Sequence, residues 1–123
     1  MKILVTYNLP RLPFENLPSD WEITFPLNEQ MSKEEILRLL PEYDVLLSIF
    51  HSHDLVDKEI IDAGSKLKLI SNYGVGYNNI DVQYAREKGI AVTNTPHSVN
   101  NPTAELAMAL MLSAARRVSE CNL

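Results

Sequence analysis

The sequence predicts an α/β protein built on a parallel sheet of five strands, with helices on both faces of the sheet. Five apolar runs recur at intervals close to the length of one strand–helix unit, and each is typical of a strand: residues 3–5, 21–25, 45–50, 67–70 and 90–93. Helical patterns occupy three of the gaps between these runs. Strands that alternate with helices form a parallel sheet whose two faces are both covered.

Capping signals predict three short helices, which follow the second, third and fourth strands. Ser32 and Glu35 match a capping box, in which each side chain satisfies a free backbone N–H, and Pro41 ends that helix. The other two helices each begin at an aspartate cap and close at a glycine in the left-handed conformation: Asp57 with Gly64, and Asp81 with Gly89.

Two segments fall outside this regular alternation. Residues 9–20 hold three prolines and predict a loop between the first two strands. Pro102 fits the first turn of a long helix, in which residues 104–115 are nearly all apolar or small. A helix that is apolar on most sides must be covered on most sides, so we expect this one to cross to another domain or subunit.

Composition limits the classes of function. The 123 residues carry a net charge of −5, which argues against non-specific nucleic-acid binding. The single cysteine, Cys121, excludes an internal disulfide and suits the reducing cytosol. The first residues lack a signal-peptide pattern, and the longest apolar run, residues 106–112, is far below the ~20 residues of a membrane span. We therefore expect a cytoplasmic chain with no nucleic-acid or membrane partner.

A glycine turn after the fourth strand is the main candidate binding site. Gly74, Val75 and Gly76 stand at the carboxyl end of that strand, where open α/β sheets bind ligands. Glycine lacks the Cβ that would block a close approach, and successive free N–H groups suit a carboxylate or a phosphate. A tight turn that binds nothing remains an equal alternative from the spacing alone.

The same turn is a poor match to a dinucleotide fingerprint. Gly74 and Gly76 occupy the first two glycine positions, but Asn79 stands at the third. No acidic residue ends the following strand, since residues 93–95 are Thr, Asn and Thr. The turn therefore suits a small carboxylate better than a pyrophosphate.

Other reactive side chains give no second site. His51, His53 and Asp54 lie together, but no further His or Cys pattern supports a metal site. His97 follows a proline in a polar loop, and we expect it to be exposed to solvent. Cys121 has no evident activating neighbour, so we assign no catalytic residue and no metal ligand in this chain.

Three motifs give the chain a family resemblance. They are GVGYNNID at residues 74–81, GIAVTNTP at 89–96, and TAE at 103–105, which opens a helix ending in Arg116 and Arg117. With these motifs the chain resembles the D-isomer-specific 2-hydroxyacid dehydrogenases, which include glyoxylate/hydroxypyruvate reductases and phosphoglycerate dehydrogenases. The resemblance is close over residues 44–120, whereas residues 1–43 fit only a general flavodoxin-like start.

The resemblance implies a flavodoxin-like substrate-binding domain at residues 1–101. Residues 102–123 would be a crossover helix toward an NAD-binding domain, with NAD or NADP as the cofactor. The backbone N–H groups of Val75 and Gly76, beside Gly74, would hold the carboxylate of a small 2-oxoacid. The rest of the implied site is a pocket wall of Ser48, Ile49 and Phe50, and a nicotinamide contact formed by Val75 and Thr103.

The resemblance also implies what this chain lacks. The family's glycine-rich NAD fingerprint and its catalytic arginine, glutamate and histidine lie beyond the long helix, so we expect no turnover by residues 1–123. Asn78 stands where the family often has aspartate, a mild change. Two alternatives stay open: a stand-alone module that binds or senses small carboxylates, and an interaction module. We expect exposed apolar residues to pair two copies into a homodimer through the 102–120 helix.

Overall fold

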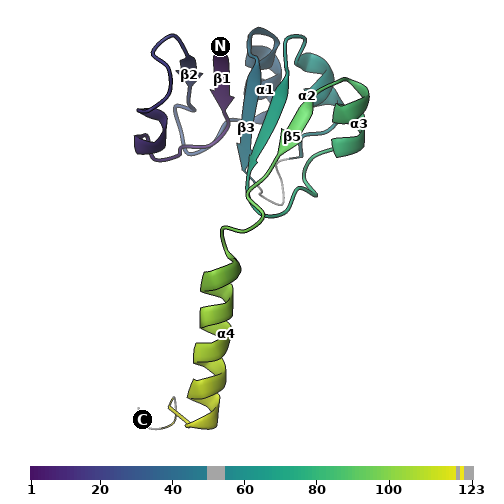
Figure 1. Ribbon diagram of the computed structural model, residues 1–123. Helices are drawn as coiled ribbons and strands as arrows, with labels where there is room; N and C mark the ends of the chain where they lie inside the picture. The colour runs from purple at the N-terminus through teal and green to yellow at the C-terminus, as the bar shows by residue number, and fades with distance from the viewer. Residues whose placement is uncertain (50–54, 119, 121–123) are drawn as a thin grey trace.

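The computed structural model describes residues 1–49, 55–118 and 120. Its five strands form one parallel sheet in the order β2-β1-β3-β4-β5 (Figure 1). This is the flavodoxin-like order, and it confirms the predicted α/β fold with a parallel sheet of five strands. The strands are β1 (Lys2–Val5), β2 (Glu22–Thr24), β3 (Val45–Ile49), β4 (Leu69–Tyr73) and β5 (Ala91–Thr93).

Strand β4 continues farther than its apolar run predicts. The sequence places the strand at residues 67–70, yet pairing with β3 extends β4 to Tyr73. In this register Asn72 lies opposite Ser48, and Tyr73 lies opposite Ile49. The polar residues Ser71 and Asn72 interrupt the apolar pattern, so the end of the strand is set by pairing rather than by hydrophobicity.

The three short helices begin at the predicted caps. Ser32 forms a complete capping box at α1 (Lys33–Leu39), and Pro41 lies in the 3-10 turn η2 (Leu40–Glu42) that follows. Asp57 accepts from the backbone N–H of Ile60 at the start of α2 (Lys58–Ala63). Asp81 accepts in the same way from Tyr84 at the start of α3 (Val82–Glu87).

The closing glycines differ from each other. Gly89 has a φ of 75°, in the left-handed conformation that the sequence predicts. Gly64 has a φ of −77°, so the prediction of a left-handed residue there is wrong. A Cβ at Gly64 would lie 2.7 Å from Leu67 Cβ, so glycine is required there by the close approach of the next segment.

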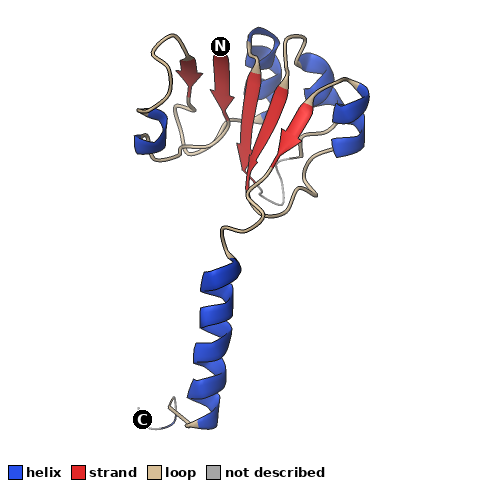
Figure 2. Cartoon of the chain, viewed as in Figure 1, coloured by secondary structure: helices blue, strands red, loops and turns tan. Residues whose placement is uncertain are grey.

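The two faces of the sheet are covered unequally (Figure 2). Helices α1, α2 and α3 pack over one face around fully buried residues such as Leu4, Leu46 and Ile70. The other face carries Ile3, Val5 and Val45, and side chains of residues 9–25 pack on it. That segment, predicted as a loop, contains the 3-10 turn η1 (Leu12–Phe14). The expected α-helices on both faces therefore pack on one face only among the described residues, because the second face is covered by this segment instead. An apolar hollow of about 500 Å³ remains on this second face.

The last helix, α4 (Asn100–Ala115), projects away from the domain (Figure 1). None of its residues is buried, and Leu106, Leu110 and Leu112 are each about 60% exposed. The long helix is therefore where the sequence predicts it, with its apolar side chains facing solvent. Across the described ranges, no helix combines the length and the hydropathy that a bilayer crossing requires.

Candidate functional site

The carboxyl ends of the parallel strands meet at the edge of the sheet from which α4 leaves (Figure 1). In folds of this type, ligands bind outside the carboxyl ends of the strands. The turn of residues 74–79 follows β4 at this edge, and the segment from Asn94 follows the neighbouring β5. The fold thus brings together two loops that lie twenty residues apart in the sequence.

Hydrogen bonds from both flanks hold the turn in place. Three successive backbone carbonyls each accept a hydrogen bond from a neighbouring segment. The pairs are Thr95 N–H to Gly74 O at 3.0 Å, Asn94 Nδ2 to Val75 O at 2.8 Å, and Asn72 Nδ2 to Gly76 O at 2.6 Å.

These bonds also set the direction of the N–H groups. A trans peptide is planar, so its C=O and N–H point in opposite directions. Because the carbonyls of Gly74 and Val75 are held by the flanking segments, the N–H groups of Val75 and Gly76 point away from those segments. Neither N–H has a hydrogen-bond acceptor within the described residues. The turn therefore presents two adjacent, oriented donors, with Val75 itself 38% exposed.

A buried polar network supports the turn from below. Ser48 Oγ donates to Asn72 Oδ1 at 3.0 Å, and Asn79 Nδ2 donates to the same oxygen at 3.3 Å. The three side chains are 1–4% exposed. Asn79 Oδ1 has no hydrogen-bond partner in the described part of the chain. All three groups are neutral, so the network fixes the turn without placing a charge beneath it.

This arrangement suits a small carboxylate. Hydrogen bonds from backbone N–H groups to an ionised oxygen are about twice as strong as neutral ones, and donors that are already oriented cost no reorganisation. A pyrophosphate fits poorly, because it requires close approach at Asn79 and a free helix N-terminus. Here Asn79 is buried, and the Asp81 carboxylate already caps α3.

Comparison with known families identifies the domain. The model of the family described as D-isomer specific 2-hydroxyacid dehydrogenase, catalytic domain, matches residues 4–121. The chain belongs to this family. A Staphylococcus epidermidis protein named as a 2-hydroxyacid dehydrogenase is 42% identical over 120 residues, which cover 97% of this chain and 37% of that protein. The chain thus spans little more than a third of the length of such curated relatives.

Solved structures show the same fold for this 2-hydroxyacid dehydrogenase domain. The TT0316 protein of Thermus thermophilus matches with a TM-score of 0.75 and 35% identity, over 98% of this chain and 38% of that one. An NAD⁺-bound 3-phosphoglycerate dehydrogenase of Entamoeba histolytica matches at 0.69 and 30%, over 92% and 38%. An NADPH-dependent glyoxylate/hydroxypyruvate reductase of Sinorhizobium meliloti, in complex with citrate, matches at 0.70 and 27%, over 91% and 34%.

The predicted site residues occupy different positions in the dehydrogenase domain. Gly74, Val75 and Gly76 form the turn itself. Ser48 is buried in the polar network, and Ile49, at the end of β3, is half-buried. Phe50 lies outside the described residues, as do His51, His53, Asp54 and Cys121.

The two remaining candidates lie on the α4 side of the domain. Thr103 is exposed in the first turn of α4, and its N–H donates to Val99 O. His97 is exposed in the preceding loop, with Nδ1 3.4 Å from Asn100 Nδ2. No hydrogen bond in the described ranges joins either residue to the glycine turn.

Sequence reasoning did not identify the asparagines as the residues that hold the turn. In the sequence, Asn79 is distinctive only at the third glycine position, and Asn94 only as a residue that is not acidic where an acidic one would be expected. Asn72 lies within β4, beyond the apolar run that marks this strand in the sequence. A signal was available in the parallel register, which pairs Asn72 with Ser48 and so predicts a polar pair at a strand end.

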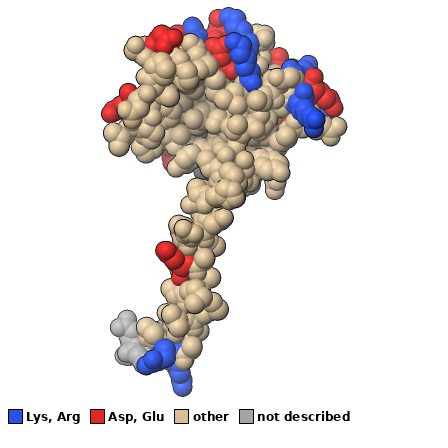
Figure 3. All heavy atoms as spheres, viewed as in Figure 1, with Lys and Arg blue, Asp and Glu red and all other residues tan. Residues whose placement is uncertain are grey.

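The titratable groups with shifted pKa values make no hydrogen bond to the glycine turn within the described ranges. Asp57 and Glu59 raise the pKa of Lys33 to about 12 through hydrogen bonds to its ammonium. At the opposite end of the sheet, the Lys2 N–H and the Lys68 ammonium lower the pKa of Asp44. On the face that Figure 3 shows, charged side chains gather at that end, and few lie where α4 joins the domain. No cluster of three or more metal-ligating side chains occurs among the described residues.

Proposed function

We propose that the chain is the substrate-binding portion of an NAD(P)-dependent oxidoreductase that interconverts a small 2-oxoacid and its D-2-hydroxyacid. The observation that carries this proposal is the pair of free, oriented N–H groups at Val75 and Gly76. Family membership supplies the reaction class. The citrate complex of the Sinorhizobium meliloti relative supports a carboxylate ligand, because citrate is itself a carboxylate.

In this proposal the chain orients the substrate for the reaction. The Val75 and Gly76 N–H groups hold the carboxylate of the 2-oxoacid, which fixes the neighbouring carbonyl for attack. Ile49 and Phe50 form the pocket wall, and Ser48, which is 2% exposed, contributes through its hydrogen bond to Asn72. A nicotinamide cofactor, when bound, supplies or accepts the hydride, and Val75 and Thr103 face it. Relatives bound to NAD⁺ or NADPH support this cofactor class without selecting between the two.

The domain organisation is part of the proposal. Residues 1–101 form the substrate-binding domain, and residues 102–123 lead toward a nucleotide-binding domain. The turn does not fit a pyrophosphate, so this chain has no site for the main part of the cofactor within its described residues. We therefore expect the purified 123-residue chain to oxidise no NADH in the presence of glyoxylate or hydroxypyruvate. Cys121 as the single cysteine supports a cytoplasmic location.

Carboxylate recognition is tested by calorimetry with two ligands. Pyruvate and its neutral amide, pyruvamide, have nearly the same shape but differ in the charge that faces the N–H groups. We expect saturable binding of pyruvate and binding of pyruvamide weaker by about tenfold or more, since charge-assisted hydrogen bonds contribute about twice the free energy of neutral ones. Equal binding of the two ligands, or no binding of pyruvate, would contradict the proposal.

A specific observation favours an additional interaction role for the last helix. Leu106, Leu110 and Leu112 are mostly exposed on α4, which is unusual for a monomer. We propose that two copies pair through the 102–120 helix. Sedimentation equilibrium should show a species of twice 13.9 kDa. Leu106→Glu with Leu110→Glu should weaken the dimer at least tenfold, roughly the effect of exposing one leucine, whereas Asn101→Glu should not. A wild-type monomer at all concentrations would contradict this pairing.

A stand-alone binding module would use the same turn without a second domain. The intact mass of the protein in the cells that make it distinguishes the two proposals. A mass well above 13.9 kDa supports the dehydrogenase. A mass equal to that value supports the module.

A further inference from the structure

The Asn94 side chain reaches the glycine turn from the segment that follows the neighbouring strand. Its Nδ2 donates to Val75 O at 2.8 Å across nineteen residues of sequence. Asn94 is half-buried and directly follows β5, whereas Val75 lies in the turn after β4. The next residue, Thr95, uses its backbone N–H to hold Gly74 O. The segment after β5 thus donates hydrogen bonds to two successive carbonyls of the turn.

Only one of these two hydrogen bonds depends on the identity of a side chain. Every residue except proline would supply the Thr95 N–H, whereas the bond to Val75 O requires a side-chain donor at position 94. Val75 O belongs to the same planar peptide as the Gly76 N–H, so the Asn94 amide fixes the direction in which that N–H points.

We propose that Asn94 is a positioning residue of the carboxylate site, which it serves by holding the Val75 carbonyl and thereby aiming the Gly76 N–H. The inference rests on the proposed function of the turn. Asn72 plays the matching part on the other flank by holding Gly76 O at 2.6 Å, but it is 1% exposed and inside the core network. Asn94 is the member of this pair that can be changed without opening the core.

The chemistry of an amide suits this position. An aspartate has nearly the same shape but only accepts hydrogen bonds, so it would repel Val75 O and place a negative charge beside a carboxylate ligand. A lysine could donate, but its charge would compete with the turn for the ligand. A neutral donor aligns the carbonyl without itself attracting or repelling the carboxylate.

The test compares Asn94→Ala and Asn94→Asp with a matched control, Asn78→Ala, in the 123-residue chain. Asn78 is an exposed amide in the same turn. Pyruvate affinity is measured by titration, and folding is measured by thermal melting. We expect Asn94→Ala to weaken pyruvate binding about fivefold to tenfold, the effect of one hydrogen bond, and Asn94→Asp to weaken it further. The Gly76 amide resonance should move in both variants before ligand is added, with melting temperatures close to wild type.

The outcomes separate this inference from the proposed function. If the wild-type chain shows no pyruvate binding, both are overturned. If the wild-type chain binds but Asn94→Ala binds equally well with an unmoved Gly76 resonance, only the positioning role is overturned. Loss of affinity in Asn78→Ala as large as that in Asn94→Ala would also overturn it, because the effect would then be general to the turn.

Discussion

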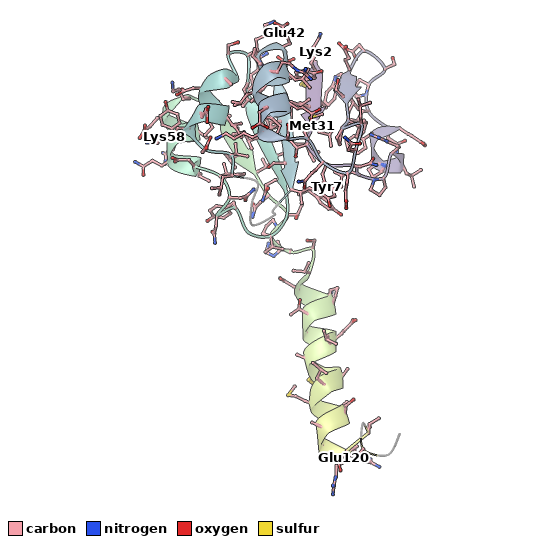
Figure 4. All side chains as sticks on the ribbon, turned by 180° about the vertical axis from the view of Figure 1, so that it is seen from behind. Lys2, Tyr7, Met31, Glu42, Lys58 and Glu120 are labelled. Atoms are coloured by element: carbon pink, nitrogen blue, oxygen red, sulfur yellow. The ribbon has the colours of Figure 1, made fainter. Side chains whose placement is uncertain are left out.

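The two ends of the sheet use opposite kinds of polar chemistry. At the amino end, the Asp44 carboxylate accepts from the Lys2 N–H and from Lys68 Nζ, each at 2.9 Å, and so joins the starts of β1, β3 and β4. At the carboxyl end, the network of Ser48, Asn72 and Asn79 is neutral and buried. Figure 4 shows Lys2 and Glu42 together at the charged end, with Tyr7 closer to α4.

This difference indicates how the fold separates stability from binding. Exposed ion pairs contribute little free energy each, because water and salt screen them. A buried neutral network is costly to break, and it leaves no charge that would compete with an anion for the N–H donors. The carboxyl end is therefore fixed in shape and open to a ligand, whereas the amino end joins strands and faces solvent.

The largest expected effect comes from breaking the neutral network. Asn72→Leu keeps the volume but leaves Ser48, Asn79 and the Gly76 carbonyl without their hydrogen bonds. We expect a loss of about 3 kcal/mol or more in the free energy of unfolding, measured by urea denaturation. The matched control is Asn78→Leu on the exposed surface, which should change that free energy by no more than about 0.5 kcal/mol. Similar losses in the free energy of unfolding of both variants would contradict the stabilising role that we assign to the buried network at the carboxyl end.

A smaller, pH-dependent effect is expected at the amino end. The pKa of Asp44 is lowered by the Lys2 N–H and then by Lys68, so its contribution is present above the ordinary value of 3.8 and is lost as the pH falls through the lower folded value. Asp44→Asn should therefore be less stable than wild type at neutral pH, with the difference shrinking in acid. Urea unfolding from neutral pH to below 3.8 measures this. An unchanged difference in acid would contradict the assignment, and Asp20→Asn serves as the exposed control.

The smallest expected effect on stability comes from an exposed ion pair that lies at the same end of the sheet as the glycine turn. Lys33 lies at the start of α1, on the same side of the sheet as the glycine turn, and bonds Asp57 and Glu59 at 2.7 Å. Its pKa is raised to about 12, so its contribution is present below 10.5 and is lost as the pH rises through about 12. Because Lys33 is exposed, we expect Lys33→Gln to cost less than Asp44→Asn and the loss to vanish at about 1 M salt. A large loss of stability in Lys33→Gln that persists in salt would contradict this account, because it would mean that the end of the sheet determines the effect and the exposure of the ion pair does not.

The regular parts of the fold were predictable from local signals. The aspartate and serine caps predicted where three helices begin, because a cap side chain bonds its own first turn. Apolar runs located the five strands to within a few residues. Strand order and the end of β4 were not predictable in this way, since both depend on pairing between distant segments.

The site was predictable only in part, for the same reason. Gly74 and Gly76 indicated a turn that allows close approach, but which way its N–H groups point depends on Asn72 and Asn94. Those two residues reach the turn through the register of β3, β4 and β5, which no short motif encodes. The conformation at Gly64 was mispredicted because its role is set by contact with Leu67.

The central claim is that the turn after β4 binds a carboxylate through the Val75 and Gly76 N–H groups. A titration of the ¹⁵N-labelled chain with pyruvate, followed by NMR, tests it most directly. We expect saturable shifts that are largest at the Val75 and Gly76 amides, with the Lys2 and Lys68 amides at the other end of the sheet unaffected. Shifts centred on those lysines, or no saturable shift in the turn, would contradict the account.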